Sequence, residues 1–249
     1  MPAPTRTERR YGLTHDSILV HCPGPLRMSG GYFEIEWLAA RQLALSDEEL
    51  RGSGDGLDGV TIVSYSNRGE QTLLESGLDF LGFRNYAILR TAATPWDHLY
   101  KLTLLLDWLA SGRCGTEYLL CLDADDNLFV NHPRLILDRF HEAGCEILFG
   151  ATGADAPTSP ECWAFENSVA EYTDPNHRHL NAGGFIGRSS FIATCAREIL
   201  DASQADPTFC RSPKGFNDQL AWRHMHRRYY PRIKIDCGCR IFLRFDQFR

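Results

Sequence analysis

Three aspartates stand close together in the middle of the chain, in the segment LDADDN at residues 122–127. The segment directly follows an apolar run, and in open α/β sheets ligands bind at the carboxyl ends of the strands. Two ionised carboxylates about 5 Å apart repel by roughly 3 kcal/mol at an effective dielectric near 20, so such a turn needs full hydration or a cation. Oxygen ligands suit Mg²⁺ or Mn²⁺. On this motif alone, the alternative that the aspartates only form a turn stays open.

A glycine-rich segment and a later polar segment supply further candidate residues. The paired glycines Gly183 and Gly184 allow the backbone to approach a ligand closely. Asn181 beside them can both donate hydrogen bonds to a sugar or phosphate and accept hydrogen bonds from it. Asn217 is expected to cap a helix, with Asp218 in the first turn, where a carboxylate is favoured. Both segments also have a purely structural interpretation, as a tight turn and as a helix start.

The composition excludes some classes of partner. The chain has 249 residues and a net charge of −6, so it has no basic excess with which to bind a nucleic acid or an anionic membrane. No apolar run approaches membrane-spanning length, and no apolar stretch follows the charges of the N-terminus, so we expect neither a membrane span nor a secretory signal. A cytoplasmic protein without a disulfide framework is therefore expected from its nine scattered cysteines. Zinc at Cys237 and Cys239 with His224 and His226 is not favoured, because no second Cys-x-x-Cys pair supports it.

The elements that position these residues alternate along the chain. Apolar runs predict strands at residues 60–65, 86–89, 118–122 and 146–149. Helical spacing predicts helices at residues 69–81 and 132–143, and a third that begins with Thr94 as N-cap and Pro95 at the first helical position. This alternation predicts an α/β fold, with a mostly parallel sheet flanked by helices.

The N-terminal and C-terminal parts of the chain do not continue this alternation. Residues 234–243 are expected to form a strand, a tight turn and another strand. The glycines of residues 52–59 predict a flexible connection between an N-terminal elaboration at residues 1–57 and a main domain at residues 58–249. Within the elaboration, residues 17–20 are compatible with a short strand and residues 32–45 with a helix.

Taken together and in this order, the segments resemble the glycosyltransferase domain of the procollagen lysyl hydroxylases and the related procollagen galactosyltransferases. The matching segments are DADD at 123–126, ECW at 161–163, LNAGGFIG at 180–187, NDQL at 217–220 and IDCGCRIF at 235–242. The resemblance covers about residues 60–243. It implies a Rossmann-like fold of the GT-A type, a UDP-sugar donor and Mn²⁺, or Mg²⁺, as the cofactor.

The resemblance also implies roles for single residues. Asp123 and Asp126 match the metal-binding aspartates of the family. Cys237 stands where the family has a third, histidine ligand, and a thiolate suits Mn²⁺ poorly, so Asp236, a water or the donor diphosphate is left to complete the shell. Trp163 resembles a tryptophan on a mobile loop that covers the site. The residues expected to bind the donor are Ser64, Ser66, Lys101, Asp125, Asn181, Gly183, Gly184 and Asn217, of which Lys101 resembles the donor-phosphate lysine.

The expected activity is metal-dependent transfer of a hexose from a UDP-sugar to a hydroxyl acceptor, which can be a small molecule, a glycan or a protein. Asn181 is expected to orient the sugar hydroxyls. Asp218 is the candidate general base if the reaction inverts, and otherwise stabilises the oxocarbenium face. Two other functions stay open: a sugar-nucleotide-binding module without turnover, and a nucleotidyltransferase. The latter is disfavoured because residues 64–68 lack a glycine-rich, basic nucleotide loop.

Overall fold

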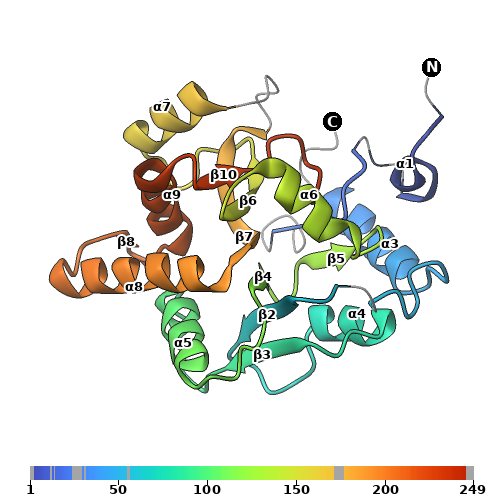
Figure 1. Cartoon of the computed structure of the whole chain (residues 1–249), viewed down its shortest axis with the longest axis horizontal. Helices are drawn as coiled ribbons and strands as arrows, with labels where there is room; N and C mark the ends of the chain where they lie inside the picture. The colour runs from blue at the N-terminus through green and yellow to red at the C-terminus, as the bar shows by residue number, and fades with distance from the viewer. Residues whose placement is uncertain are drawn as a thin grey trace.

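The computed structural model describes residues 3–11, 13, 15–23, 30, 32–54, 57–170 and 177–244. Its centre is a six-stranded sheet with the order β10-β6-β7-β4-β2-β3 (Figure 1). The strands are β2 (Val60–Ser66), β3 (Tyr86–Arg90), β4 (Tyr118–Leu122), β6 (Ile147–Thr152), β7 (His179–Arg188) and β10 (Ile233–Ile235). Neighbouring strands are parallel, except that β7 runs antiparallel to β6 and β4 on its two sides. The predicted α/β class with a mostly parallel sheet is confirmed.

Helices cover both faces of this sheet (Figure 1). On one side lie α5 (Leu99–Ala110), α8 (Ser189–Ala205) and α9 (Asp218–Tyr229), and on the other lie α4 (Leu73–Leu81) and α6 (Leu135–Ala143). Each side has its own apolar cluster, with Leu102 and Ile199 in the first and Leu74 and Phe140 in the second. Burying a leucine, isoleucine or phenylalanine side chain contributes about 1.5–3 kcal/mol, so the two clusters fix the helices on the sheet.

A second, three-stranded sheet joins distant parts of the chain. Its order is β11-β1-β5, with β1 (Leu19–His21) parallel to β11 (Phe242–Arg244) and antiparallel to β5 (Asn127–Phe129). The N-terminal segment therefore pairs with strands from the middle and the end of the chain. The chain has strands on both sides of residues 236–241, as expected, but β10 and β11 belong to different sheets. The division at residue 57 stays a prediction.

The remaining elements lie at the edges of this core. They are α1 (Arg6–Tyr11), α3 (Tyr32–Ala44), α7 (Pro160–Val169) and a small hairpin of β8 (Arg211–Ser212) and β9 (Gly215–Phe216). Trp37 of α3 is buried in a third apolar cluster with residues of β1, β5 and β11. In the described parts of the chain, no helix combines the length and the apolar character that a membrane crossing needs.

Two helix starts differ from the sequence prediction. The side chain of Thr72 accepts a hydrogen bond from the N–H of Glu75, and Glu75 accepts one from Thr72 in return, so α4 begins after this capping box and not at residue 69. The predicted helix start at Thr94 is wrong, because α5 begins only at Leu99. The Asp97 carboxylate accepts the N–H of Leu99 at 2.8 Å and satisfies a donor that the first turn leaves free.

Candidate functional site

An open cleft of about 260 Å³ lies where β2 and β4 end. This is the edge at which an open α/β sheet binds ligands. Charged, polar and aromatic side chains line the cleft. They are those of Tyr65, Ser66, Asn67, Arg68, Trp96, His98, Lys101, Asp123, Asp125 and Asp126, with Ala124 between them.

The acidic turn after β4 is held in place by backbone hydrogen bonds to three other elements. The N–H of Asp123 donates to the carbonyl of Gly183 on β7 at 3.0 Å. The carbonyl of Asp126 accepts the N–H of Cys22, the residue after β1, at 2.8 Å, and the first turn of α4 donates to the middle of the turn. The carboxylates are therefore presented by a fixed backbone at the junction of the two sheets.

His21, the last residue of β1, adds an imidazole to this turn. Its Nε2 lies 3.5 Å from Oδ2 of Asp126, and the ligand atoms of His21, Asp123 and Asp126 all lie within 4.8 Å of one another. His21 is 7% exposed, and neither of its ring nitrogens has a hydrogen-bond partner among the described residues. An imidazole with two carboxylates is a ligand set that suits Mn²⁺ or a similar divalent ion. These residues fit the expected metal.

A glycine makes room for that imidazole. A Cβ on Gly183 would lie 2.5 Å from Cε1 of His21 and 2.7 Å from its Nε2, which is closer than non-bonded atoms approach. Its neighbour Gly184 makes room for another side chain, because a Cβ there would lie 3.1 Å from the ring of Phe242. The paired glycines thus accommodate His21 and Phe242, and their contact with a donor stays a prediction.

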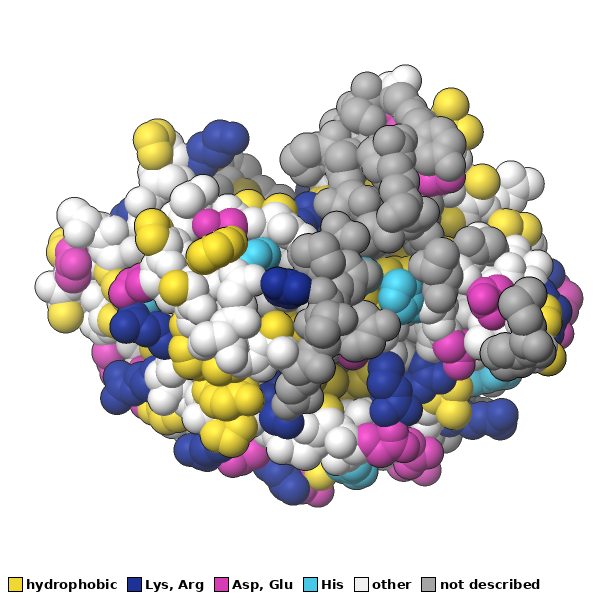
Figure 2. All heavy atoms as spheres, turned by 90° about the horizontal axis from the view of Figure 1, so that it is seen from above, with side chains coloured by type: hydrophobic (Ala, Val, Ile, Leu, Met, Phe, Trp, Pro, Cys, Tyr) yellow, Lys and Arg dark blue, Asp and Glu magenta, His cyan; other side chains and the backbone are white. Residues whose placement is uncertain are grey.

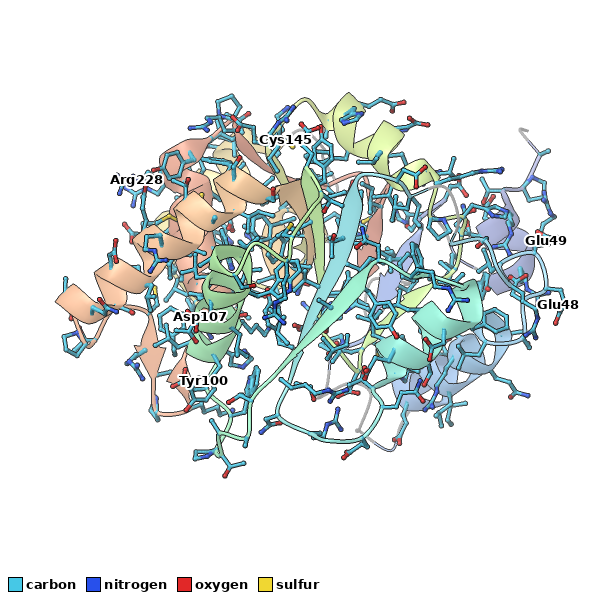
Figure 3. All side chains as sticks on the ribbon, turned by 60° about the horizontal axis from the view of Figure 1, so that its bottom comes forward. Glu48, Glu49, Tyr100, Asp107, Cys145 and Arg228 are labelled. Carbon is cyan, nitrogen blue, oxygen red and sulfur yellow. The ribbon has the colours of Figure 1, made fainter. Side chains whose placement is uncertain are left out.

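Lys101, on α5, joins two carboxylates beside the cleft. Its Nζ lies 2.7 Å from Oδ1 of Asp123 and 2.9 Å from Oδ2 of Asp218. His98, one turn earlier, places Nδ1 3.4 Å from Oδ1 of Asp218. Burial lowers the pKa of Lys101, but the two carboxylates outweigh it and hold this pKa above its usual value. Lys101 therefore stays charged at neutral pH. Figure 3 labels its neighbour Tyr100 on the same helix.

The two carboxylates that Lys101 contacts respond differently. Burial raises the pKa of Asp218, but the charge of Lys101 and of His98 outweighs it, so this pKa lies below its usual value. Burial also raises the pKa of Asp123. Lys101 lowers this pKa, but the negative charges of Asp126 and Asp218 raise it further, so the pKa of Asp123 stays above its usual value. Asp218 is therefore ionised at neutral pH, whereas Asp123 gains from a further positive charge nearby.

Of the residues expected to contact the nucleoside, some line the cleft and one is buried in the core. Ser66 and Asp125 line the cleft, and Asp125 forms an ion pair with Arg68. The hydroxyl of Ser64 is fully buried and donates to the carbonyl of Leu122 at 2.7 Å. Ser64 therefore ties β2 to β4, and its hydroxyl is not presented to the cleft.

The side chains expected at the donor sugar are engaged in local hydrogen bonds. Oδ1 of Asn181 accepts the N–H of Gly183 at 3.1 Å, and its Nδ2 lies 3.4 Å from Oε1 of Gln219. Asn217 caps α9, as expected, because its Oδ1 accepts the N–H of Leu220 at 2.9 Å. The cap fixes the first turn of α9, which carries Asp218, the residue paired with Lys101.

The structure does not place Asp236 with the other expected metal ligands, Asp123 and Asp126. Its carboxylate accepts the N–H groups of Arg240 at 3.0 Å, Ile241 at 2.7 Å and Phe242 at 3.0 Å. It belongs to the turn before β11 and lies outside the group of ligand atoms that includes Asp123. Backbone donors already occupy its oxygens, so its role in the structure is to hold this turn.

Trp163 lies on a helix and not on a loop. The Ser159 side chain accepts the N–H of Cys162 and Pro160 occupies the first turn, so that the segment begins α7. Trp163 is 49% exposed, and its ring stacks on that of His179 with centroids 6.5 Å apart. The prediction that Trp163 lies on a loop is therefore wrong, because the residue is part of α7. Its role in covering the site stays a prediction.

Among the residues that the structure places at the site and sequence reasoning missed are His21, Arg68 and His98. Two of them, His21 and Arg68, have a weak signal in the sequence. His21 is the first polar residue after the apolar run at residues 18–20, and Arg68 follows the end of β2 by two residues. Polar residues at the end of an apolar strand or just after it are therefore the pattern that would have found these two, whereas His98 precedes α5 and does not follow a strand directly.

Comparison with known proteins finds similarity only at the level of solved structures. No protein-family model matches the chain, and no curated protein does. Among solved structures, the chain is similar to a glycosyltransferase involved in the glycosylation of the major capsid of PBCV-1, with 13% identity and a TM-score of 0.46. The similarity covers 71% of this chain and 80% of that one. At this level it carries no conclusion about activity.

Proposed function

We propose that this protein is a metal-dependent glycosyltransferase of the GT-A type that takes its sugar from a UDP-sugar donor. The observation that carries the proposal is the group of His21, Asp123 and Asp126, whose ligand atoms lie within 4.8 Å of one another at the edge of the cleft. When bound there, a divalent ion supplies the positive charge that a departing diphosphate requires.

The charge of the cleft supports a need for such an ion. Its lining carries the carboxylates of Asp123, Asp125 and Asp126 against the cations of Arg68 and Lys101, and both cations are already paired with carboxylates. The whole chain has a net charge of −6, and Figure 2 shows acidic and basic side chains interspersed on the face that it draws. A diphosphate in this cleft therefore needs a cation that the side chains alone do not supply.

Other side chains of the cleft suit the rest of a nucleotide sugar. Lys101 lies next to the proposed metal residues and offers a second positive charge to the leaving phosphate. Tyr65 and Trp96 line the same cleft and offer aromatic surface to a base. Beside the cleft, Asp218 is ionised, 8% exposed and paired with Lys101, and it is the candidate general base or stabiliser of positive charge on the sugar.

Calorimetric titration with UDP tests the proposal. We expect the wild-type chain to bind UDP only with Mn²⁺ present, and Asp126→Asn to lose this binding because it removes a charged ligand. Asp107→Asn is the matched control, because Asp107 is an exposed aspartate on α5 (Figure 3) and does not line the cleft. Equal binding of UDP with and without Mn²⁺ would contradict the proposed metal site.

Turnover distinguishes the proposal from its two alternatives. A glycosyltransferase releases UDP from one member of a panel of UDP-sugars, in a manner that depends on Mn²⁺. A binding module binds the donor and releases no UDP. A nucleotidyltransferase instead releases pyrophosphate from a nucleoside triphosphate, and either of these two outcomes would contradict the proposal.

A further inference from the structure

A second group of metal-ligand side chains lies outside the cleft. One ring nitrogen each of His15 and His177 and the Sγ of Cys239 all lie within 4.8 Å of one another. In a tetrahedral zinc site, with Zn–N about 2.0–2.1 Å and Zn–S about 2.3 Å, the ligand atoms are about 3.5 Å apart. Small side-chain rotations are therefore enough for the three residues to share one ion.

The three residues come from segments far apart in the sequence. His15 precedes β1, His177 precedes β7, and Cys239 lies in the turn between β10 and β11. His177 and Cys239 are 1% and 0% exposed, while His15 is half-buried. The two imidazole rings meet edge to face, with centroids 5.0 Å apart. The group thus lies mostly inside the protein, and the half-buried His15 leaves it a side open to solvent.

The backbone at Cys239 is a second, independent observation. Its φ is 49°, a left-handed conformation that favours glycine, although the adjoining Gly238 does not adopt it. The N–H of Cys239 donates to the carbonyl of Asp236 at 2.9 Å, and its carbonyl accepts the hydroxyl of Ser17 at 2.5 Å. A cysteine held in this conformation on both sides has its Cβ in a fixed position, from which a small side-chain rotation directs the thiol toward the two imidazoles. Residues with such backbones cluster at ligand sites.

We propose that His15, His177 and Cys239 form a zinc site that is separate from the proposed manganese site. Two imidazoles and a thiolate are ligands of Zn²⁺ and poor ligands of Mn²⁺. The thiol of Cys239 releases its proton to solvent as it binds the ion. Since three protein ligands leave one position of the tetrahedron, a water on the half-buried side of His15 completes it. The two proposed sites therefore differ in the metal that they select.

Such an ion would stabilise the part of the fold that presents the catalytic residues. It would join the start of β1 to the start of β7 and to the turn before β11. His21 is the last residue of β1, and Asn181 lies on β7. An ion at residues 15, 177 and 239 would therefore position these two strands, although it touches no residue that lines the cleft.

Cobalt substitution in the full-length chain tests the zinc site directly. We expect the metal-free protein to bind one Co²⁺ with a thiolate-to-cobalt charge-transfer band and the visible bands of a tetrahedral ion, and we expect Zn²⁺ to displace it. Cys239→Gly suits the left-handed backbone; it should lose the charge-transfer band and weaken Zn²⁺ binding by at least about 10-fold. Cys237→Ser is the matched control, because Cys237 is a buried cysteine two residues away that is not in the group.

Three results would overturn the proposal: no thiolate band in the wild-type chain, a band retained in Cys239→Gly, or a band lost in Cys237→Ser. Should Cys239→Gly not fold, His177→Asn gives the same comparison through weakened Zn²⁺ binding. Asp126→Asn separates the two sites, since it removes a manganese ligand and should leave the thiolate band unchanged. Loss of the band in Asp126→Asn would also contradict a separate zinc site.

Discussion

Adding one methyl group at Gly183 should remove His21 from the metal site. A Cβ at this position would lie 2.5 Å from Cε1 of His21, whereas carbon atoms in contact are about 3.5 Å apart, so the ring must retreat by about 1 Å. Metal–ligand distances are fixed to about 0.2 Å, so a ring displaced this far no longer coordinates. We expect Gly183→Ala to weaken Mn²⁺ binding by about 10- to 100-fold, and we expect the same loss in His21→Ala.

Calorimetric Mn²⁺ titration of the wild type and four variants decides whether this reasoning holds. Gly184→Ala is the matched control, because its Cβ would press on Phe242 at 3.1 Å, not on the imidazole, and should leave Mn²⁺ affinity unchanged. The double variant Gly183→Ala with His21→Ala should bind no more weakly than His21→Ala alone, because both changes remove the same ligand. Wild-type affinity in Gly183→Ala, or additive losses in the double variant, would refute the reasoning.

Three further outcomes follow from the buried charges. Asp218→Asn should keep Mn²⁺ and UDP binding and lower kcat by at least about 100-fold in UDP-release assays, and near-normal turnover would remove Asp218 from the catalytic residues. Burial lowers the pKa of His226 from 6.5 to about 4. As the pH falls, His226 therefore becomes protonated in the unfolded chain before it does in the folded one. The wild type should lose up to about 3 kcal/mol of its free energy of unfolding between pH 6.5 and pH 4. Urea unfolding of His226→Phe should show a smaller loss over this range, and an equal loss would contradict the assignment. Arg223→Met should cost about 3–5 kcal/mol in urea unfolding, because it leaves Glu166 buried without its bidentate partner at 2.8 Å, and an unchanged midpoint would refute this.

The central sheet was predictable because its strands are buried on both faces. All residues of β2 and of β4 are buried, and such strands appear in the sequence as nearly continuous apolar runs, interrupted in β2 only by Thr61, Ser64 and Ser66. The acidic turn follows from the same pattern, since Asp123 is the first residue after β4. Asn217 as a helix cap was also predictable, because a cap depends only on residues within one turn.

The third candidate metal ligand was not predictable in the same way. His21 lies on β1, which pairs with β5 and β11, and each of these strands has only three residues. Strands this short carry no readable periodicity, and a sequence pattern does not say which distant strands pair. Asp236 was predicted as a metal ligand because it lies near the end of the chain in a segment that matches the family. In the structure its oxygens accept backbone N–H groups. The helix start at Thr94 failed for a local reason, since Asp97 lies closer to the first free N–H group of α5.

Pulsed electron paramagnetic resonance of Mn²⁺ bound to the full-length chain tests the central claim most directly, because the nitrogen of a coordinating imidazole modulates the electron spin echo. With Mn²⁺ at saturation, we expect nitrogen modulation in the wild-type protein and its loss in His21→Ala. A wild-type echo without nitrogen modulation, or one that His21→Ala leaves unchanged, would contradict a metal site built from His21, Asp123 and Asp126.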